Sequence, residues 1–308
     1  MLMKKFLFNQ ITSSELSKTV LFSVIYFLWY VFLVGLRLEH IILYLIIVLF
    51  YFGIKATRQF ILAFSIFIFY WIVYDSLRIL PNYKVNPIHI LEPYLLEKQL
   101  FGINDEGILR TLNEYFALYH KDIFDILGGL FYLSWIPVPL AFAMYLYFVD
   151  KPLFFRFSYC FVFINFLGFI IYYVYPAAPP WYVAKYGFEP HFNVSGGVAG
   201  LKYFDQLVDI PLFEGIYKKN SNVFAAIPSL HSTYPFIVLY YGIQKRLGFV
   251  NIIFAILCVG IWFTAVYTGH HYVIDVLAGI LLAIFGIFIF EKFIVYTLLS
   301  EKSVQIRE

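Results

Sequence analysis

Charged side chains are scarce in this sequence. Only 13% of its 308 residues are charged, whereas 62% are hydrophobic. Because a water-soluble globule cannot bury so much apolar surface, the composition excludes that class and predicts an integral membrane protein. The formal net charge is only +3, so the charge balance indicates neither nucleic acid nor a strongly anionic partner.

Cysteine is also scarce, and no small-residue cleavage site follows the first apolar stretch. The two cysteines, Cys160 and Cys258, lie inside apolar stretches, which favours small buried residues over a disulfide or a metal site. The sequence lacks a carboxylate cluster of the kind that binds magnesium or calcium near its histidine motifs. We therefore expect a multi-pass protein that needs no metal and no other cofactor.

The sequence is rich in long apolar runs. A helix that crosses the hydrocarbon core needs about 20 mostly apolar residues, and such runs recur along the chain. The predicted fold is an all-α, polytopic membrane helical bundle of about eight transmembrane helices that forms a single membrane domain overall. The predicted spans are 20–36, 41–54, 60–74, 126–149, 153–175, 229–243, 249–267 and 272–290.

The charges of the short loops predict the orientation. With both termini in the cytoplasm, the basic loops and the basic tail all lie inside, as the positive-inside rule requires. The polar segments 75–125 and 176–228 then lie outside. The compact chain favours a bacterium, so we expect the inner membrane, with this face toward the periplasm; in a eukaryote the face would be the Golgi lumen. The basic residues are Lys55, Arg58, Lys151, Arg156, Lys245, Arg246, Lys292 and Lys302.

An amphipathic pattern lies in the first outer segment. Ile108, Leu112, Tyr115, Phe116 and Tyr119 share one helical face, and polar residues share another. This pattern predicts a helix that lies on the membrane surface. A helix packed on the protein's own outer face is an equal alternative.

Three ionisable residues lie at outer ends of predicted spans. His231 follows Pro228 and Ser229, which are typical of the start of a helix. His271 and Asp275 are four residues apart, so a helix places them on one face, where the carboxylate can orient one ring nitrogen. This arrangement would prepare a nucleophilic histidine.

The alternative for each histidine is a hydrogen-bonding residue that caps its helix. That interpretation is the weaker one here, because the loop charges place His231 at the same surface as His271 and Asp275. Ionisable groups set into span ends are costly and tend to be functional. His270 is rotated off the face of His271, so we expect it to support the site or contact substrate.

Two of these motifs resemble a known family. The Pro-Ser-Leu-His run at 228–231 resembles the second motif of the type 2 phosphatidic acid phosphatase superfamily, and His271-x-x-x-Asp275 resembles the end of its third. The proline-rich run 176–182 and the segment from His270 to Gly279 are similar to the branch of the inositol phosphorylceramide synthases, which are inositolphosphotransferases. The likeness spans roughly 125–290.

The resemblance implies a fold and a division of roles. Residues 1–124 would hold N-terminal transmembrane helices and the outer amphipathic segment, and 125–300 would form a six-helix catalytic core. His271 would be the nucleophile, Asp275 would orient it, and His231 would be the acid that protonates the leaving oxygen.

The sequence departs from the wider superfamily at its phosphate-binding cations. Thr264 and Ala265 stand where the third motif usually has Ser-Arg, and the Arg-Pro pair of the first motif is absent. A phosphoryl group in transfer still needs its negative charge stabilised. Arg78, at the outer end of the third span, is the first candidate, although pairing with Asp75 is an equal alternative. Weaker candidates are Lys185, Lys218 and Lys219.

Other candidate substrate contacts flank the motifs. Trp181 and Tyr182 belong to the proline-rich run, which we expect to shape the rim of the site, although proline also ends spans for structural reasons. Asp125 could bind a headgroup hydroxyl, but an acidic residue in a first helical turn also has a structural role. Ser229 and His270 complete the set.

The predicted function is a phospholipid headgroup transferase. A phosphoinositol-type group would pass from a glycerophospholipid to His271 and then to a ceramide or another lipid alcohol. The alternative is a lipid phosphatase that uses water, because the triad fits both; the missing cations and the motif resemblance favour transfer. A transporter is disfavoured, since its ionisable residues usually lie near the midplane or on broken helices.

Overall fold

The computed structural model describes residues 12–192, 194–218 and 222–295. These residues form two compact units that divide between Pro81 and Asn82. The predicted boundary was at residue 124. Residues 82–124 belong to the second unit because buried side chains from this segment, Glu97 and Asn113, bond the backbone around residues 266–274.

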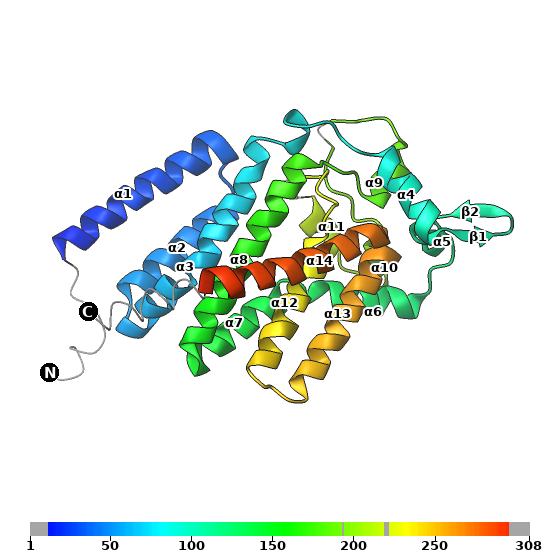
Figure 1. Cartoon of the computed structure of the whole chain (residues 1–308). Helices are drawn as coiled ribbons and strands as arrows, with labels where there is room; N and C mark the ends of the chain where they lie inside the picture. The colour runs from blue at the N-terminus through cyan, green and yellow to red at the C-terminus, as the bar shows by residue number, and fades with distance from the viewer. Residues whose placement is uncertain (1–11, 193, 219–221, 296–308) are drawn as a thin grey trace. The chain divides into compact units, whose positions relative to one another are not determined.

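The N-terminal unit is built from apolar helices (Figure 1). Its first helix begins at a capping box in which Thr12 and Glu15 bond each other's backbone N–H groups. At the other end of the unit, Asp75 accepts bonds from Arg37 and Arg78 and contacts the buried His40. The elements are α1 (Ser13–Trp29), η2 (Tyr30–Val34), α2 (Leu38–Phe52), α3 (Lys55–Ser76) and η3 (Leu77–Ile79).

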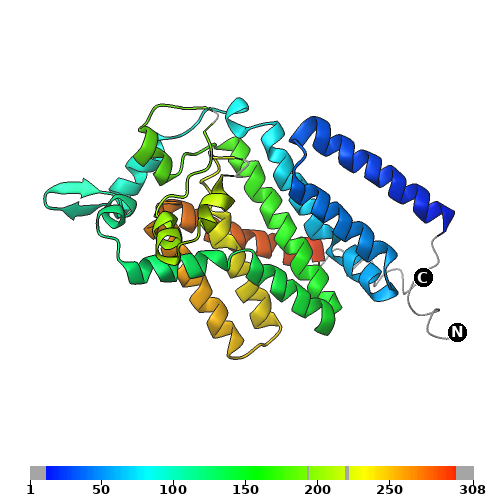
Figure 2. The same cartoon turned by 180° about the vertical axis from the view of Figure 1, so that it is seen from behind.

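The second unit is a helical bundle with α12 at its centre, where it contacts α7, α8, α13 and α14 (Figures 1 and 2). Shorter helices and loops gather at one end. The elements are η4 (Asn82–Lys84), α4 (Leu91–Phe101), β1 (Ile103–Asp105), β2 (Ile108–Arg110), α5 (Leu112–Leu118), α6 (Asp122–Leu133), α7 (Pro137–Val149), α8 (Lys151–Val174), α9 (Pro180–Tyr186), α10 (Leu201–Val208), α11 (Leu212–Tyr217), α12 (Leu230–Gln244), α13 (Val250–Tyr267), α14 (Val273–Ile289) and η5 (Phe290–Val295).

The all-α polytopic architecture is confirmed, although the spans differ in length. The second and sixth predicted spans are α2 and α12, with 15 residues each, which is shorter than a hydrocarbon core of about 30 Å requires. Among the described residues, six helical segments are long and apolar enough to cross a membrane. They are Ser13–Val34, Lys55–Ile79, Asp122–Val149, Lys151–Val174, Val250–Tyr267 and Val273–Val295.

The fourth predicted span lies within the apolar segment Asp122–Val149, where a short turn separates two helices. α6 ends at Leu133, and α7 begins at Pro137. Proline has no N–H to donate, so one helical hydrogen bond is missing here, although the Val138 N–H still donates to the Ser134 carbonyl at 3.0 Å. The chain turns at residues 134–136, and this turn packs the partly buried Trp135 against the core of the bundle end.

The first outer segment contains a β-hairpin that the sequence pattern did not predict. β1 and β2 pair antiparallel with Asp105 opposite Ile108. The two turn residues, Glu106 and Gly107, have positive φ angles of 51° and 86°, as a type I′ turn requires. Figures 1 and 2 show the hairpin projecting from the helices. α5 follows and packs against α13 with Asn113 buried, in agreement with the alternative of a helix on the protein's own face.

Within the second unit, the predicted cytoplasmic loops at residues 150–156 and 245–246 lie together at the end of the bundle opposite His231. Lys245 Nζ is 2.8 Å from Asp150 Oδ2, so the loop after α12 is joined to the loop before α8. Arg156 pairs with Glu291 of η5. The shared location agrees with the loop charges.

Close packing of α14 on α12 depends on Gly279. A Cβ atom there would lie 2.2 Å from the Ser229 carbonyl oxygen, whereas a Cβ at Gly215 in α11 would meet no atom within 4 Å. We expect Gly279→Ala to lower the free energy of unfolding by about 1–3 kcal/mol, measured by thermal unfolding in detergent. Gly215→Ala is the matched control, and equal melting temperatures for the two variants would contradict this packing.

Candidate active site

His231 lies in the first turn of α12. Ser229 caps this helix, because its hydroxyl accepts the Ser232 N–H at 3.3 Å. The Ser229 N–H donates to the Asp275 carbonyl at 2.9 Å, so the start of α12 is tied to the first turn of α14. Ser229 is fully buried and thus has a structural role; contact with substrate stays a prediction for this residue.

The three predicted catalytic residues form one chain of contacts. His231 Nδ1 is 3.1 Å from His271 Nε2. On the other side of the ring, His271 Nδ1 is 3.4 Å from Asp275 Oδ2. His271 is 5% exposed and Asp275 is 0% exposed. One nitrogen of His271 thus faces its carboxylate, and the other faces the second histidine.

Aromatic rings pack against His231. The Tyr132 ring stacks on it with centroids 4.9 Å apart, and Trp135 meets it edge-on at 4.5 Å. Tyr132 comes from the end of α6, and Trp135 from the turn before Pro137. Sequence reasoning missed both residues, and the available signal was a proline inside a predicted span.

His270 is a buried neighbour of this triad. Its Nδ1 is 2.9 Å from Thr268 Oγ1, and its ring contacts Tyr132 and Tyr217. Burial lowers the pKa of His270 to about 3. The ring is therefore neutral at physiological pH. Its contacts stabilise the backbone segment that carries His271.

Two side chains from the first outer segment hold residues 268–272, the catalytic turn. Asn113 of α5 donates to the carbonyls of Val266 and His271 at 2.7 and 2.9 Å. Glu97 of α4 is 0% exposed, and its carboxylate accepts the N–H groups of Val273 and Ile274 at 3.0 and 3.2 Å. Burial raises the pKa of Glu97, an effect that the two N–H bonds oppose. Sequence reasoning missed both residues.

The proline-rich run folds over the same turn. The Trp181 N–H donates to the Gly269 carbonyl at 3.0 Å. Tyr182 is fully buried, and its hydroxyl donates to the Glu189 carbonyl and accepts the His191 N–H. Tyr182 thus stabilises the outer loop, and a substrate contact stays a prediction for it.

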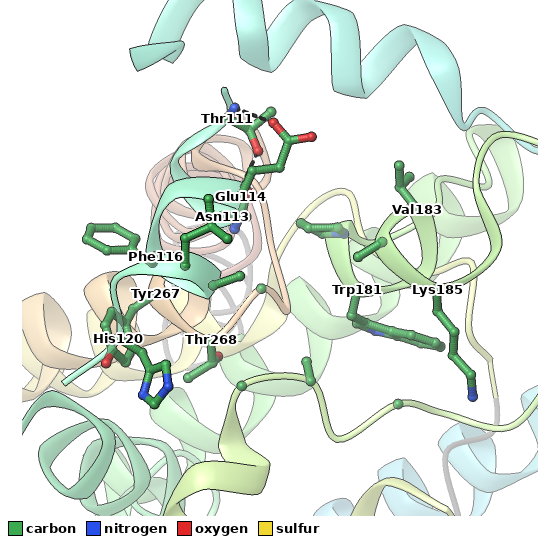
Figure 3. A pocket seen from close by; sticks show the side chains of 18 of the residues that line it. Thr111, Asn113, Glu114, Phe116, His120, Trp181, Val183, Lys185, Tyr267 and Thr268 are labelled. Carbon is green, nitrogen blue, oxygen red and sulfur yellow. Dashed lines mark hydrogen bonds between the residues drawn. The ribbon is translucent and has the colours of Figure 1, made fainter. Parts of the chain in front are cut away.

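A pocket of about 810 Å³ adjoins the catalytic turn. Figure 3 shows Trp181 and Lys185 on one side of it, with His120, Tyr267 and Thr268 on the other. Asp125 also lines this pocket, whereas His231 and His271 do not. The pocket therefore lies beside the reacting atoms and does not contain them.

Two of the predicted phosphate cations, Lys185 and Lys218, lie in the described part of the second unit, and neither bonds the triad. Lys185 lines the pocket. Arg78 belongs to the N-terminal unit and lies 2.7 Å from Asp75, which is the pairing given as its alternative. Lys218 pairs with Glu214, and Lys219 lies outside the described residues. In the part of the chain that the structure describes, no lysine or arginine bonds to His231, His271 or Asp275.

Most of the second unit matches a known protein family. The sequence model of the PAP2 superfamily matches residues 107–289. The chain belongs to the PAP2 superfamily. The resemblance found in the histidine motifs is thereby confirmed, because PAP2 denotes the type 2 phosphatidic acid phosphatases.

Relatives within the PAP2 superfamily are named as sphingolipid synthases. The chain is 46% identical over 260 residues to phosphoinositol dihydroceramide synthase of Bacteroides thetaiotaomicron, covering 84% of this chain and 85% of that protein. It is 28% identical to inositol phosphorylceramide synthase of Candida albicans, covering 79% of this chain and 50% of that protein. It is 29% identical to the catalytic subunit of inositol phosphorylceramide synthase of Saccharomyces cerevisiae, covering 79% of this chain and 59% of that protein. No solved structure matches the chain.

Glu97 precedes the PAP2 match, which begins at residue 107. The match therefore does not cover this residue. Other titratable groups around the turn are His231, His270 and Asp275, with Glu114 near Tyr272.

We expect Glu97→Gln to lower kcat by about 10–100-fold, because a misplaced catalytic group costs about that much. The measurement is steady-state kinetics of the purified protein in detergent micelles. Glu92→Gln is the matched control, since Glu92 is on the same helix and its side chain is 66% exposed. Equal kinetics for both variants would contradict the role of Glu97.

Proposed function

We propose that the protein transfers a phosphoinositol-type headgroup from a glycerophospholipid to a ceramide or a related lipid alcohol. The observation that carries this proposal is the contact of His271 with Asp275 on one nitrogen and with His231 on the other. The names of the relatives support an inositol-phosphate donor and a ceramide acceptor.

The first half of the reaction forms a phosphohistidine. His271 Nε2 attacks the phosphorus, and a P–N bond forms as the P–O bond to diacylglycerol breaks. His231 gives its proton to the leaving oxygen. Asp275 faces His271 Nδ1 and stabilises the positive charge that develops on the imidazole ring.

The second half runs through the same residues in reverse. His231, now neutral, takes the proton of the acceptor hydroxyl as its oxygen attacks phosphorus. The P–N bond breaks, and its electron pair returns to Nε2 of His271. Every proton that His231 gives up in the first half is recovered in the second.

The amino end of α12 supports this chemistry where basic side chains do not. His231 lies in the first turn of this 15-residue helix, and the amino end of a helix favours negative charge. A phosphoryl group bound between His231 and His271 would lie beside it.

Exclusion of water favours transfer over hydrolysis. His271 is almost fully buried, and Tyr132 and Trp135 pack against His231. A phosphohistidine in such a site is protected until an acceptor enters.

Substitutions of the three triad residues should reduce activity in different ways. His271→Ala removes the phosphorylated atom, so no phosphoenzyme should form and transfer should vanish. His231→Ala should lose about 10²–10⁴-fold, and a donor with a nitrophenyl leaving group should restore part of that rate. Asp275→Asn should keep the fold with a severe but incomplete loss. The measurement is phosphoenzyme trapping with both donors; rescue of His271→Ala in place of His231→Ala would exchange the two roles.

We propose that the catalytic turn faces the periplasm in a bacterial inner membrane. Glu189 and Gln244 are exposed at opposite ends of the second unit. In a background without Cys160 and Cys258, an impermeant maleimide should label Glu189→Cys on intact spheroplasts and label Gln244→Cys only after permeabilisation. The opposite pattern would reverse the orientation.

A further inference from the structure

A second histidine–aspartate pair lies outside the catalytic triad. Asp125, at the start of α6, is only 3% exposed. Its Oδ2 is 2.9 Å from His120 Nδ1, and its Oδ1 accepts the Tyr267 hydroxyl at 2.8 Å. Both carboxylate oxygens are therefore occupied within the protein. Asp125 orients His120, and His120 is the residue that remains available to a ligand.

The hydrogen-bonding character of His120 follows from these contacts. An ionised carboxylate only accepts, so Nδ1 carries a proton and Nε2 of the neutral ring is an acceptor. The ring stacks on Tyr203 at 3.8 Å with an interplanar angle of 12°, which fixes its plane. The side chain is 34% exposed, and within the described residues Nε2 has no hydrogen-bond partner. His120 thus presents a fixed acceptor in the wall of the pocket (Figure 3).

The opposite wall is aromatic, and the rim is basic. Trp181 is backed by Gly197, where a Cβ would lie only 2.5 Å from the indole. Lys185 and Lys202 are exposed lining residues, and their ammonium groups rest over tyrosine rings at 5.0 and 4.9 Å. The pocket therefore combines a flat apolar surface, a fixed acceptor and a positive rim, because Arg110 and the two lysines outnumber the lining carboxylates, Glu114 and Asp125.

These features discriminate among the parts of a lipid. An acyl chain would leave the polar groups of the lining without partners. A cationic headgroup would be repelled by the ammonium groups of the two lysines. A cyclic polyol on an anionic phosphate fits, because its hydroxyls can donate to His120, its C–H face can lie on Trp181, and its charge is attracted by the rim. The volume of about 810 Å³ suits a ligand of this size.

We propose that this pocket binds the polyol ring of the donor headgroup, with His120 accepting a hydrogen bond from a ring hydroxyl. The inference rests on the proposed function, since it specifies where the donor is recognised. Thr268 and Gly269 line the pocket directly before His270 and His271, so a bound ring abuts the catalytic turn. The pocket recognises the ring, and the triad acts on the phosphorus.

Binding is measured on the full-length His271→Ala protein, which cannot turn over. The probes are glycerophosphoinositol, glycerophosphocholine and inositol 1-phosphate, followed by calorimetry. We expect glycerophosphoinositol to bind and glycerophosphocholine not to bind. Adding His120→Ala should weaken glycerophosphoinositol about three- to tenfold, the value of one hydrogen bond. His191→Ala is the matched control, because His191 is exposed at the same end and does not line the pocket.

Kinetics of the active enzyme test recognition of the donor. His120→Ala should raise KM for phosphatidylinositol and leave KM for ceramide and kcat unchanged. A rise in KM for ceramide, or no change with either substrate, would overturn the proposal. If His120→Ala does not fold, Lys202→Gln and Trp181→Phe must each weaken glycerophosphoinositol binding, and unchanged binding in either variant would overturn the proposal.

The source of the polyol is tested by competition. Phosphatidylinositol in nanodiscs should displace inositol 1-phosphate from the His271→Ala protein. If it does not, the pocket serves a soluble polyol phosphate, and the donor assignment is wrong. The proposed function fails separately, when the wild-type enzyme makes no inositol-containing sphingolipid although glycerophosphoinositol binds in a His120-dependent manner.

Discussion

Asp275 can orient His271 only while the first turn of α14 stays in place. His271 lies in the turn before α14, and Asp275 lies in the first turn of that helix, so a small rotation of the helix start would move the carboxylate away from Nδ1. Contacts from several elements prevent this. Glu97 accepts the N–H groups of Val273 and Ile274, and Asn113 holds the His271 carbonyl. The start of α12 bonds the Asp275 carbonyl, so the same contact set positions His231.

The sequence predicts the parts of the site that depend on local spacing. A four-residue interval placed His271 beside Asp275, and loop charges placed His231 at the same end of the bundle. Glu97 and Asn113 could not be found in this way, because they bond residues 153 to 177 positions away, and such distant contacts leave no periodic signal. Their segment was interpreted from its amphipathic face alone, which describes a surface and not a partner.

The break between α6 and α7 shows a different limit. Hydropathy detects one span there, because a turn of a few apolar residues does not lower the local average. Pro137 nevertheless removes one N–H from the helical bonding, and the turn at residues 134–136 brings Trp135 to His231. A residue that looks like a lipid-facing aromatic in the sequence therefore helps exclude water from the reacting atoms. Pro137 was therefore the residue in the sequence that indicated the break between α6 and α7, because its missing N–H interrupts the helical hydrogen bonds.

The charge around the triad bears on which phosphate ester can react. Asp275 and Glu97 are buried at the catalytic turn, and in the described part of the chain no basic side chain bonds the triad. A phosphomonoester dianion would bring two negative charges into this region, whereas a phosphodiester brings one. In the proposed reaction, attack of His271 on a diester would make its ring a cation that offsets the phosphate charge and that Asp275 would stabilise. The cations of the superfamily pattern, absent at Thr264 and Ala265, are what a monoester site needs. Their absence is therefore consistent with a site built to transfer a diester-linked headgroup.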